Sequence, residues 1–76
     1  MPLRQTPAYA LRCYPLGEAD LIIVFYTYNF GCVRSVARGA RRVRSRFGSA
    51  FQPFTQSELV FFEKEGQDLT RVASCE

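Results

Sequence analysis

The chain has 76 residues, and turn-forming glycines and prolines divide it into short apolar runs of strand length. The clearest run covers residues 21–27, is rich in β-branched and aromatic side chains, and is apolar on both faces. Such a run suits a strand covered on both sides or a strand of a tightly coiled barrel. The longest apolar stretch, residues 21–26, is far shorter than the roughly 20 residues that cross a bilayer. The pattern therefore predicts a small all-β fold.

Further segments have weaker strand character. Residues 7–14 alternate between two sets of side chains, one on each face of the expected strand: Tyr9, Leu11 and Cys13 against Ala10, Arg12 and Tyr14. Residues 51–63 return to strand composition, with Pro53 restricting the start of the strand, and residues 69–73 form a last short strand.

The segment at residues 32–38 is predicted to be a half-solvated strand with a basic outer face. Its side chains divide between two faces: Val33, Ser35 and Ala37 on one, Arg34, Val36 and Arg38 on the other. Turn signals separate the expected strands at residues 15–20, 28–31 and 65–68.

Five strands at these separations predict one compact barrel domain over residues 1–76, because an open sheet of this size would expose unpaired edges. The leading fold is a small, all-β, five-stranded oligonucleotide-binding (OB) barrel, and an SH3-like barrel is the second choice. A long connector, residues 39–49, falls between strands three and four. We expect a basic loop or a short helix there.

The charges of the chain are distributed unevenly. Ten Lys and Arg residues against seven Asp and Glu residues give a net charge of +3, and residues 21–57 hold six arginines and no acidic residue. Because neighbouring cations repel, a cluster without local acids favours a polyanionic partner such as a phosphate backbone. The six candidate DNA-binding residues are Arg34, Arg38, Arg41, Arg42, Arg44 and Arg46.

Two other interpretations of these arginines stay open. One is a solvated basic loop that pairs with the acidic last third of the chain. The other is a helix, although Gly39 counts against it, and the arginines that would share one helical face are Arg34, Arg38, Arg41 and Arg42. Nucleic-acid binding remains the favoured interpretation.

Aromatic residues supply a second possible contact with nucleic acid. The chain has seven Phe, four Tyr and no Trp, and most of these rings must form the core of so small a domain. Three of them stand in turn or loop contexts, where base stacking and structural packing are equally plausible roles: Tyr28, Phe30 and Phe47.

The residues that catalysis or metal binding would require are missing from the chain. It contains no His, and its three cysteines, Cys13, Cys32 and Cys75, are isolated. Three separate thiols cannot form a tetrahedral zinc site, and no Ser-His-Asp or Cys-His arrangement exists without His. We therefore expect no catalytic residue, no metal and no cofactor. The thiols are expected to be reduced, as in a cytoplasmic protein, and two of them to be small core residues.

Five segments together resemble the N-terminal domain of the RecO family of DNA repair proteins. Their order and spacing match the family from about residue 8 to residue 76, and the arginine-rich segment is the most specific. The segments are LGEADLII at 16–23, YT at 26–27 with Gly31, SVARGARR at 35–42, SRFG at 45–48 and QPFT at 52–55.

This resemblance implies an OB fold that binds single- and double-stranded DNA and anneals complementary strands. It implies cooperation with RecR in loading RecA, without ATP hydrolysis and without bond-breaking chemistry. Family members continue into a helical C-terminal region, so the resemblance implies that the chain corresponds to the N-terminal domain of a longer RecO-like protein, either as an excised domain or as a truncated product. The resemblance implies that binding of the single-stranded DNA-binding protein belongs to that further region, so this partner is not assigned to residues 1–76.

The resemblance also ranks the arginines. Carried over by position, it makes Arg38, Arg41, Arg42 and Arg46 the first candidates for DNA contact, whereas Arg34 and Arg44 rest on the charge argument. Two alternative functions stay open: a protein-interaction barrel that docks an acidic peptide or RecR, and an RNA-binding OB domain.

Overall fold

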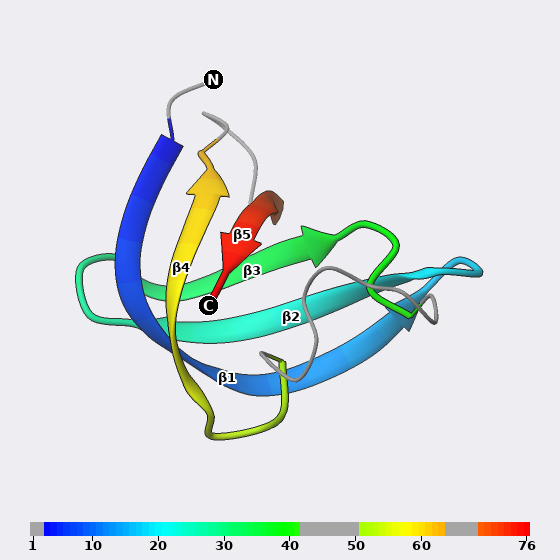
Figure 1. Ribbon diagram of the computed structural model, residues 1–76, viewed down its shortest axis with the longest axis horizontal. Coiled ribbons are helices and arrows are strands. Elements are labelled where there is room, and N and C mark those ends of the chain that lie inside the picture. The colour runs from blue at the N-terminus through cyan, green and yellow to red at the C-terminus, as the bar shows by residue number, and fades with distance from the viewer. Residues whose placement is uncertain (1–2, 42–50, 64–68) are drawn as a thin grey trace.

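The computed structural model describes residues 3–41, 51–63 and 69–76. Five strands close into a barrel in the order β1-β2-β3-β5-β4, and β4 returns to pair with β1 (Figure 1). The neighbouring strands are antiparallel except for the parallel pair of β3 and β5. The strands are β1 Leu3–Leu16, β2 Asp20–Thr27, β3 Gly31–Ala37, β4 Gln56–Phe62 and β5 Leu69–Cys75.

The predicted five-stranded OB-type barrel is confirmed by this architecture. The described residues form no helix, and the crossover that sets β5 between β3 and β4 gives the Greek-key order of a closed barrel. Closure pairs every strand on both sides, which removes the exposed edges that an open sheet would present. No helix in the described part of the chain is long and apolar enough to cross a membrane.

The core forms from the inward side chains of all five strands. On β2, Ile23 and Phe25 are completely buried while Tyr26 is exposed, so the strand is buried chiefly on one face. Phe51 packs against Phe25 edge to face, with ring centroids 6.0 Å apart. A Phe→Ala change at Phe25 would cost about 3–5 kcal/mol, because the surrounding barrel cannot collapse onto the cavity.

A β-bulge in β1 overturns the expected alternation of residues 7–14. Ala10 pairs with Phe25 and Arg12 pairs with Val24, so Leu11 is an extra residue on β1. An extra residue reverses the inward and outward positions beyond it. Tyr9 therefore shares the outward face with Arg12 and Tyr14, not with Leu11 and Cys13 as the sequence suggested.

Strand boundaries also differ from the expectation, since β1 begins at Leu3 instead of residue 7 and β5 ends at Cys75 instead of residue 73. β1 continues through Pro15 to Leu16, and β4 begins at Gln56 instead of residue 51. The segment before β4 is held to β1 by two backbone hydrogen bonds. Phe54 N–H donates to the Ala10 carbonyl at 2.7 Å, and Ala10 N–H donates to the Thr55 carbonyl at 3.4 Å. Phe54 has a positive φ of 65°, which is turn geometry and explains the late start of the strand.

Hydrogen bonds fix the loops at the two ends of β3, the first within the β2–β3 hairpin and the second to the start of β2. Before β3, the Thr27 hydroxyl donates to the Gly31 carbonyl at 2.7 Å and accepts from Phe30 N–H at 2.9 Å. After β3, Gly39 N–H donates to the Asp20 carboxylate at 2.7 Å. Gly39 has φ 71°, a conformation that favours glycine. Most of the connector beyond, where a loop or short helix was expected, lies outside the described residues.

Candidate nucleic-acid interface

The outward side chains of β1, β2, β3 and β5 form one continuous surface, which we call the outer face. Arg12 on β1 lies opposite Val24, Val24 lies opposite Arg34 on β3, and Arg34 pairs with Leu69 on β5. Residues in register on neighbouring strands share a face, and strands are about 4.8 Å apart. Arg12 and Arg34, both exposed, are therefore roughly 10 Å apart at the backbone. We call this row the arginine rung.

The next row of the outer face combines aromatic, apolar and basic side chains. Its members follow the strand pairings in order, Tyr14, Ile22, Val36 and Arg71, and the row continues onto β4 with Phe62. The guanidinium carbon of Arg71 lies 4.6 Å from the centroid of the Phe62 ring. This cation–π contact holds the Arg71 side chain while leaving it exposed.

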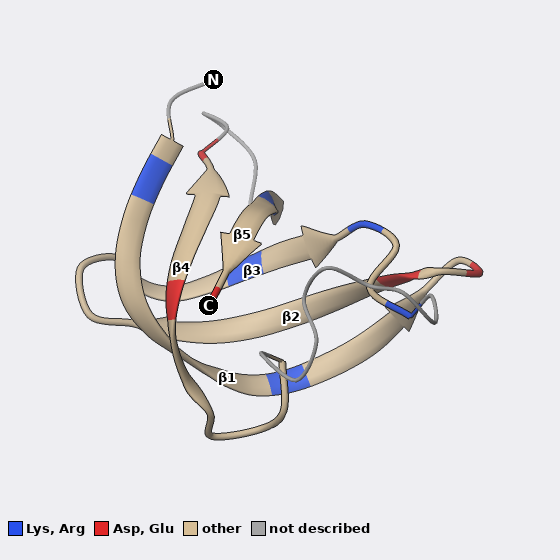
Figure 2. Cartoon of the chain, viewed as in Figure 1, with Lys and Arg blue, Asp and Glu red and all other residues tan. Residues whose placement is uncertain are grey.

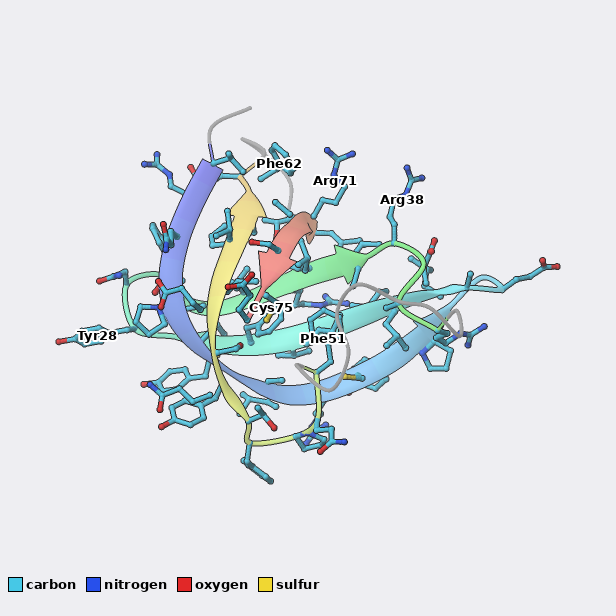
Figure 3. The ribbon with its side chains drawn as sticks, viewed as in Figure 1. Tyr28, Arg38, Phe51, Phe62, Arg71 and Cys75 are labelled. Atoms are coloured by element: carbon cyan, nitrogen blue, oxygen red, sulfur yellow. The ribbon has the colours of Figure 1, made fainter. Side chains whose placement is uncertain are left out.

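Arg38, just beyond the end of β3, joins this row at a shallow depression. The depression has a volume of about 300 Å³, and Arg38, Phe62 and Arg71 lie on its walls. Figure 3 shows these three side chains along the upper edge of the barrel, pointing away from it. Two guanidinium groups and an aromatic ring at one depression can bind a phosphate and an adjacent flat group.

Few acidic groups neutralise the outer face. Figure 2 shows basic residues on β1, β3 and β5, whereas acidic residues lie on β4 and about the β1–β2 turn. Within the described segments the one ion pair joins Arg4 and Glu63 at 3.2 Å, and it is exposed. Arginine side chains stay protonated throughout the physiological pH range, and a hydrogen bond with Tyr14 raises the pKa of Arg12 further. The outer face is therefore basic at all physiological pH values.

Arg41 is bound into the fold. One of its terminal guanidinium nitrogens donates to the Gly17 carbonyl at 2.9 Å and to the Glu18 carbonyl at 2.6 Å. Its backbone N–H donates to the Ala19 carbonyl at 2.9 Å. These bonds fasten the loop after β3 to the β1–β2 turn, so Arg41 has a structural role whether or not it also contacts a ligand.

The sequence candidates divide into three groups in the structure. Arg34 and Arg38 lie exposed on or beside the outer face, and Arg41 is bound to the turn. Four further candidates lie outside the described residues: Arg42, Arg44, Arg46 and Phe47.

Tyr28 and Phe30 occupy the same hairpin in different environments. The Tyr28 side chain is 80% exposed, and its ring points away from the barrel in Figure 3. Phe30 packs edge to face on the buried Phe61, with ring centroids 5.6 Å apart and an interplanar angle of 89°. Tyr28 is thus available to a ligand, whereas Phe30, although 40% exposed, is engaged in packing on the core residue Phe61.

Two arginines of the outer face, Arg12 and Arg71, were missed by the sequence analysis. Both lie far along the chain from the arginine cluster, and only the barrel brings them beside Arg34 and Arg38. Arg71 stands at the middle of a predicted strand, where alternation alone marks an outward position. Arg12 stands with Tyr14 opposite Leu11 and Cys13 in the expected alternation, but only the pairing of β1 with β2 and of β2 with β3 places it on the same surface as Arg34.

The three thiols differ in burial. Cys75 is buried beside the Ser57 hydroxyl at 3.0 Å, Cys13 is half-buried and donates to the Phe51 carbonyl at 3.1 Å, and Cys32 is exposed. Burial raises the pKa of both Cys13 and Cys75. Raised pKa values keep these two thiols protonated and unreactive. Among the described residues no group of three His, Cys, Asp or Glu side chains is close enough to hold a metal ion.

The closed five-stranded topology defines an all-β barrel protein of the OB type. A family model described as "Recombination protein O N terminal" matches residues 1–76, and the chain belongs to this family. It is 40% identical over 74 residues to the DNA repair protein RecO of Koribacter versatilis and 39% identical over 72 residues to that of Syntrophus aciditrophicus. These matches cover 97% and 95% of the chain but 30% and 28% of the relatives.

Proposed function

We propose that the chain is the DNA-binding OB domain of a recombination mediator in DNA repair. The name of its relatives supports the repair role. One observation supports DNA as the ligand: exposed arginines from β1, β3 and β5 meet on the outer face, and no described carboxylate pairs with them. An unneutralised basic surface on a rigid barrel gains free energy by releasing counterions from a phosphate backbone.

In this proposal the domain binds both single- and double-stranded DNA through phosphate contacts. Phosphate contacts carry little sequence information, which suits a protein that must act at any damaged site. Neutralising the phosphates of two complementary strands reduces their repulsion, and this promotes annealing. With RecR, the domain would assist the loading of RecA. No step requires a bond to be broken, so the proposal includes no catalytic residue.

The test is a titration of the chain with fluorescent single-stranded oligonucleotide at several salt concentrations, followed by anisotropy. If Arg12, Arg34, Arg38 and Arg71 each bind a phosphate, the slope of log K against log salt is about −3 or steeper. Affinity that does not depend on salt would contradict the proposal.

Arg4→Gln is a matched control variant for each arginine of the outer face. Arg4 is exposed on β1 and already pairs with Glu63, so its loss should change the salt slope less than the loss of Arg34. An acidic peptide serves as the competitor that examines the alternative function. If the peptide binds strongly to the outer face and DNA does not, the chain is a protein-interaction barrel instead.

A further inference from the structure

A groove lined by tyrosines lies on the barrel wall beside the arginine rung. We call it the tyrosine groove; Tyr9, Tyr26 and Tyr28 line it together with Pro7 and Gln56, and its volume is about 510 Å³. Sites for small organic groups have volumes of about 300–1,000 Å³, so the groove can hold one or two flat rings.

The three tyrosine rings are unusually accessible for a domain with so small a core. Tyr9 is 43% exposed, Tyr26 is 58% exposed and Tyr28 is 80% exposed. No described residue on the groove walls carries a charge. A cluster of exposed aromatic side chains on a small domain indicates a binding surface, because its contact with water is unfavourable.

Hydrogen bonds hold the backbone that carries these rings. Tyr9 and Tyr26 are direct cross-strand neighbours on β1 and β2. The Tyr28 N–H donates to the Pro7 carbonyl at 2.9 Å, and the Tyr9 hydroxyl donates to Gln56 Oε1 at 3.3 Å. The Tyr9 ring and the backbone that carries all three rings are therefore held in place before a ligand enters the groove, which lowers the entropic cost of binding.

The position of the groove indicates what chemistry it binds. Tyr9 and Tyr26 occupy the row next to the arginine rung, two residues along β2 from Val24 and on the same face. Rows on one face are separated by roughly 7 Å along a strand. A ligand that spans both rows must present anionic groups to Arg12 and Arg34 and flat, uncharged rings to the tyrosines.

We propose that the tyrosine groove binds unpaired bases of single-stranded DNA by stacking, while the adjoining phosphates lie on the arginine rung. The inference rests on the proposed DNA-binding function and adds a base-binding subsite to it. Bases stack on aromatic side chains without sequence preference, because every base has a flat π face. In a duplex the bases are already stacked on each other, so a duplex contacts the arginines alone.

Tyrosine fluorescence gives a direct test. The chain has four Tyr and no Trp, and three of the four tyrosines line the groove. We expect oligo-dT to quench this fluorescence on binding. An abasic oligonucleotide of equal length, which has the same phosphates, and a duplex should bind with salt-dependent affinity and quench little.

Variants of Tyr26 and Tyr28 complete the experiment. Tyr26→Leu should weaken oligo-dT binding about 5- to 100-fold and leave abasic and duplex binding unchanged, whereas Tyr26→Phe keeps the ring and should retain affinity. Tyr28→Ser alters a turn side chain with little effect on folding and should act in the same direction as Tyr26→Leu.

The outcomes separate the groove from the arginines. Equal, salt-dependent affinity for oligo-dT and abasic DNA in every variant would overturn the base subsite and leave the proposed function intact. Failure of all three DNAs to bind would overturn both. Quenching by a proline-rich peptide but not by oligo-dT would overturn the inference and assign the groove to a polyproline ligand.

Discussion

The loops at the two ends of β3 use their side chains in parallel ways. In the hairpin before β3, Phe30 packs on Phe61 while Tyr28 is 80% exposed. In the loop after β3, Arg41 donates to two turn carbonyls while Arg38 is exposed. Each loop thus has one side chain that stabilises the fold and one of similar chemistry that a ligand can contact.

This comparison shows that residue type does not separate structural from functional side chains. The hairpin is held by an aromatic contact and by Thr27 and Thr6, through bonds such as the one from Asn29 N–H to the Thr6 hydroxyl at 3.2 Å. The exit loop is held by a guanidinium group and the Asp20 carboxylate. The arginines of the outer face, which lie on the strands between these two loops, hold neither the hairpin nor the loop after β3 in place. The following predictions test whether this division holds.

The largest expected effect follows from removing the arginines of the strands themselves. The triple variant Arg12→Gln, Arg34→Gln, Arg71→Gln should weaken single-stranded DNA binding about 100-fold at ~0.1 M salt, since each phosphate contact contributes about fivefold there. The salt slope should flatten by about 2. Anisotropy titrations measure both, and an unchanged melting temperature shows that the barrel is intact. Unaltered affinity would indicate that DNA binds to the loops at the ends of β3 and not to the strand arginines of the outer face.

In the hairpin before β3, we expect variants of the two aromatic residues to differ in stability. Phe30→Ala should lower the free energy of unfolding by about 2 kcal/mol, because it removes the edge-to-face contact and leaves a gap beside Phe61. The melting temperature should fall by about 10 °C. Tyr28→Ala should change the free energy of unfolding by less than about 0.5 kcal/mol. Thermal denaturation followed by circular dichroism compares the two variants. Equal losses of stability would contradict the division into a structural Phe30 and a ligand-accessible Tyr28.

For the exit loop, which is the loop after β3, we expect a smaller difference in stability between variants of its two arginines. Arg41→Ala should destabilise the barrel by about 1 kcal/mol, since the turn carbonyls lose a charged donor but remain open to water. Arg38→Ala should leave the stability unchanged and lower DNA affinity about fivefold at ~0.1 M salt. Denaturant titrations and anisotropy on the same two variants give both quantities. If Arg41→Ala keeps full stability but binds DNA weakly, Arg41 is a DNA-contacting residue and not a structural one.

Much of this arrangement could be predicted from the sequence. Alternation from Val33 to Arg38 gave the correct faces of β3, because that strand pairs without a bulge. The run in residues 21–27 identified β2, whose inward residues form the centre of the core. The turn signals near Gly17 and Gly31 placed both hairpins correctly.

The parts that could not be predicted depend on contacts between distant segments. The bulge at Leu11 reversed the faces of β1, and no residue type there marks it. The role of Arg41 requires the β1–β2 turn to lie beside the exit of β3, which only the closed barrel establishes. Arg12 and Arg71 join the basic surface through strand pairing, so a search for charge clusters along the sequence could not find them.

The smallest expected effect concerns the buried thiols. The folded-state pKa values of Cys13 and Cys75 are raised above their ordinary value of 9.0 by burial. Above pH 9 the unfolded thiols lose protons that the folded thiols retain, so stability present below about pH 9 is lost as the pH rises through the folded-state pKa.

The loss attributable to Cys75 should be below about 1.4 kcal/mol for each pH unit in that range. Denaturant titrations at pH 8 and pH 10 measure it, and Cys75→Ala provides the comparison. Tyrosine ionisation affects both proteins alike, so the difference between them isolates the thiol. Because Cys32 is exposed, Cys32→Ala is the matched control and should reproduce the pH dependence of the unaltered chain. If Cys75→Ala also reproduces it, the Cys75 thiol is not shielded in solution, and the packing of β4 against β5 is looser than the fold requires.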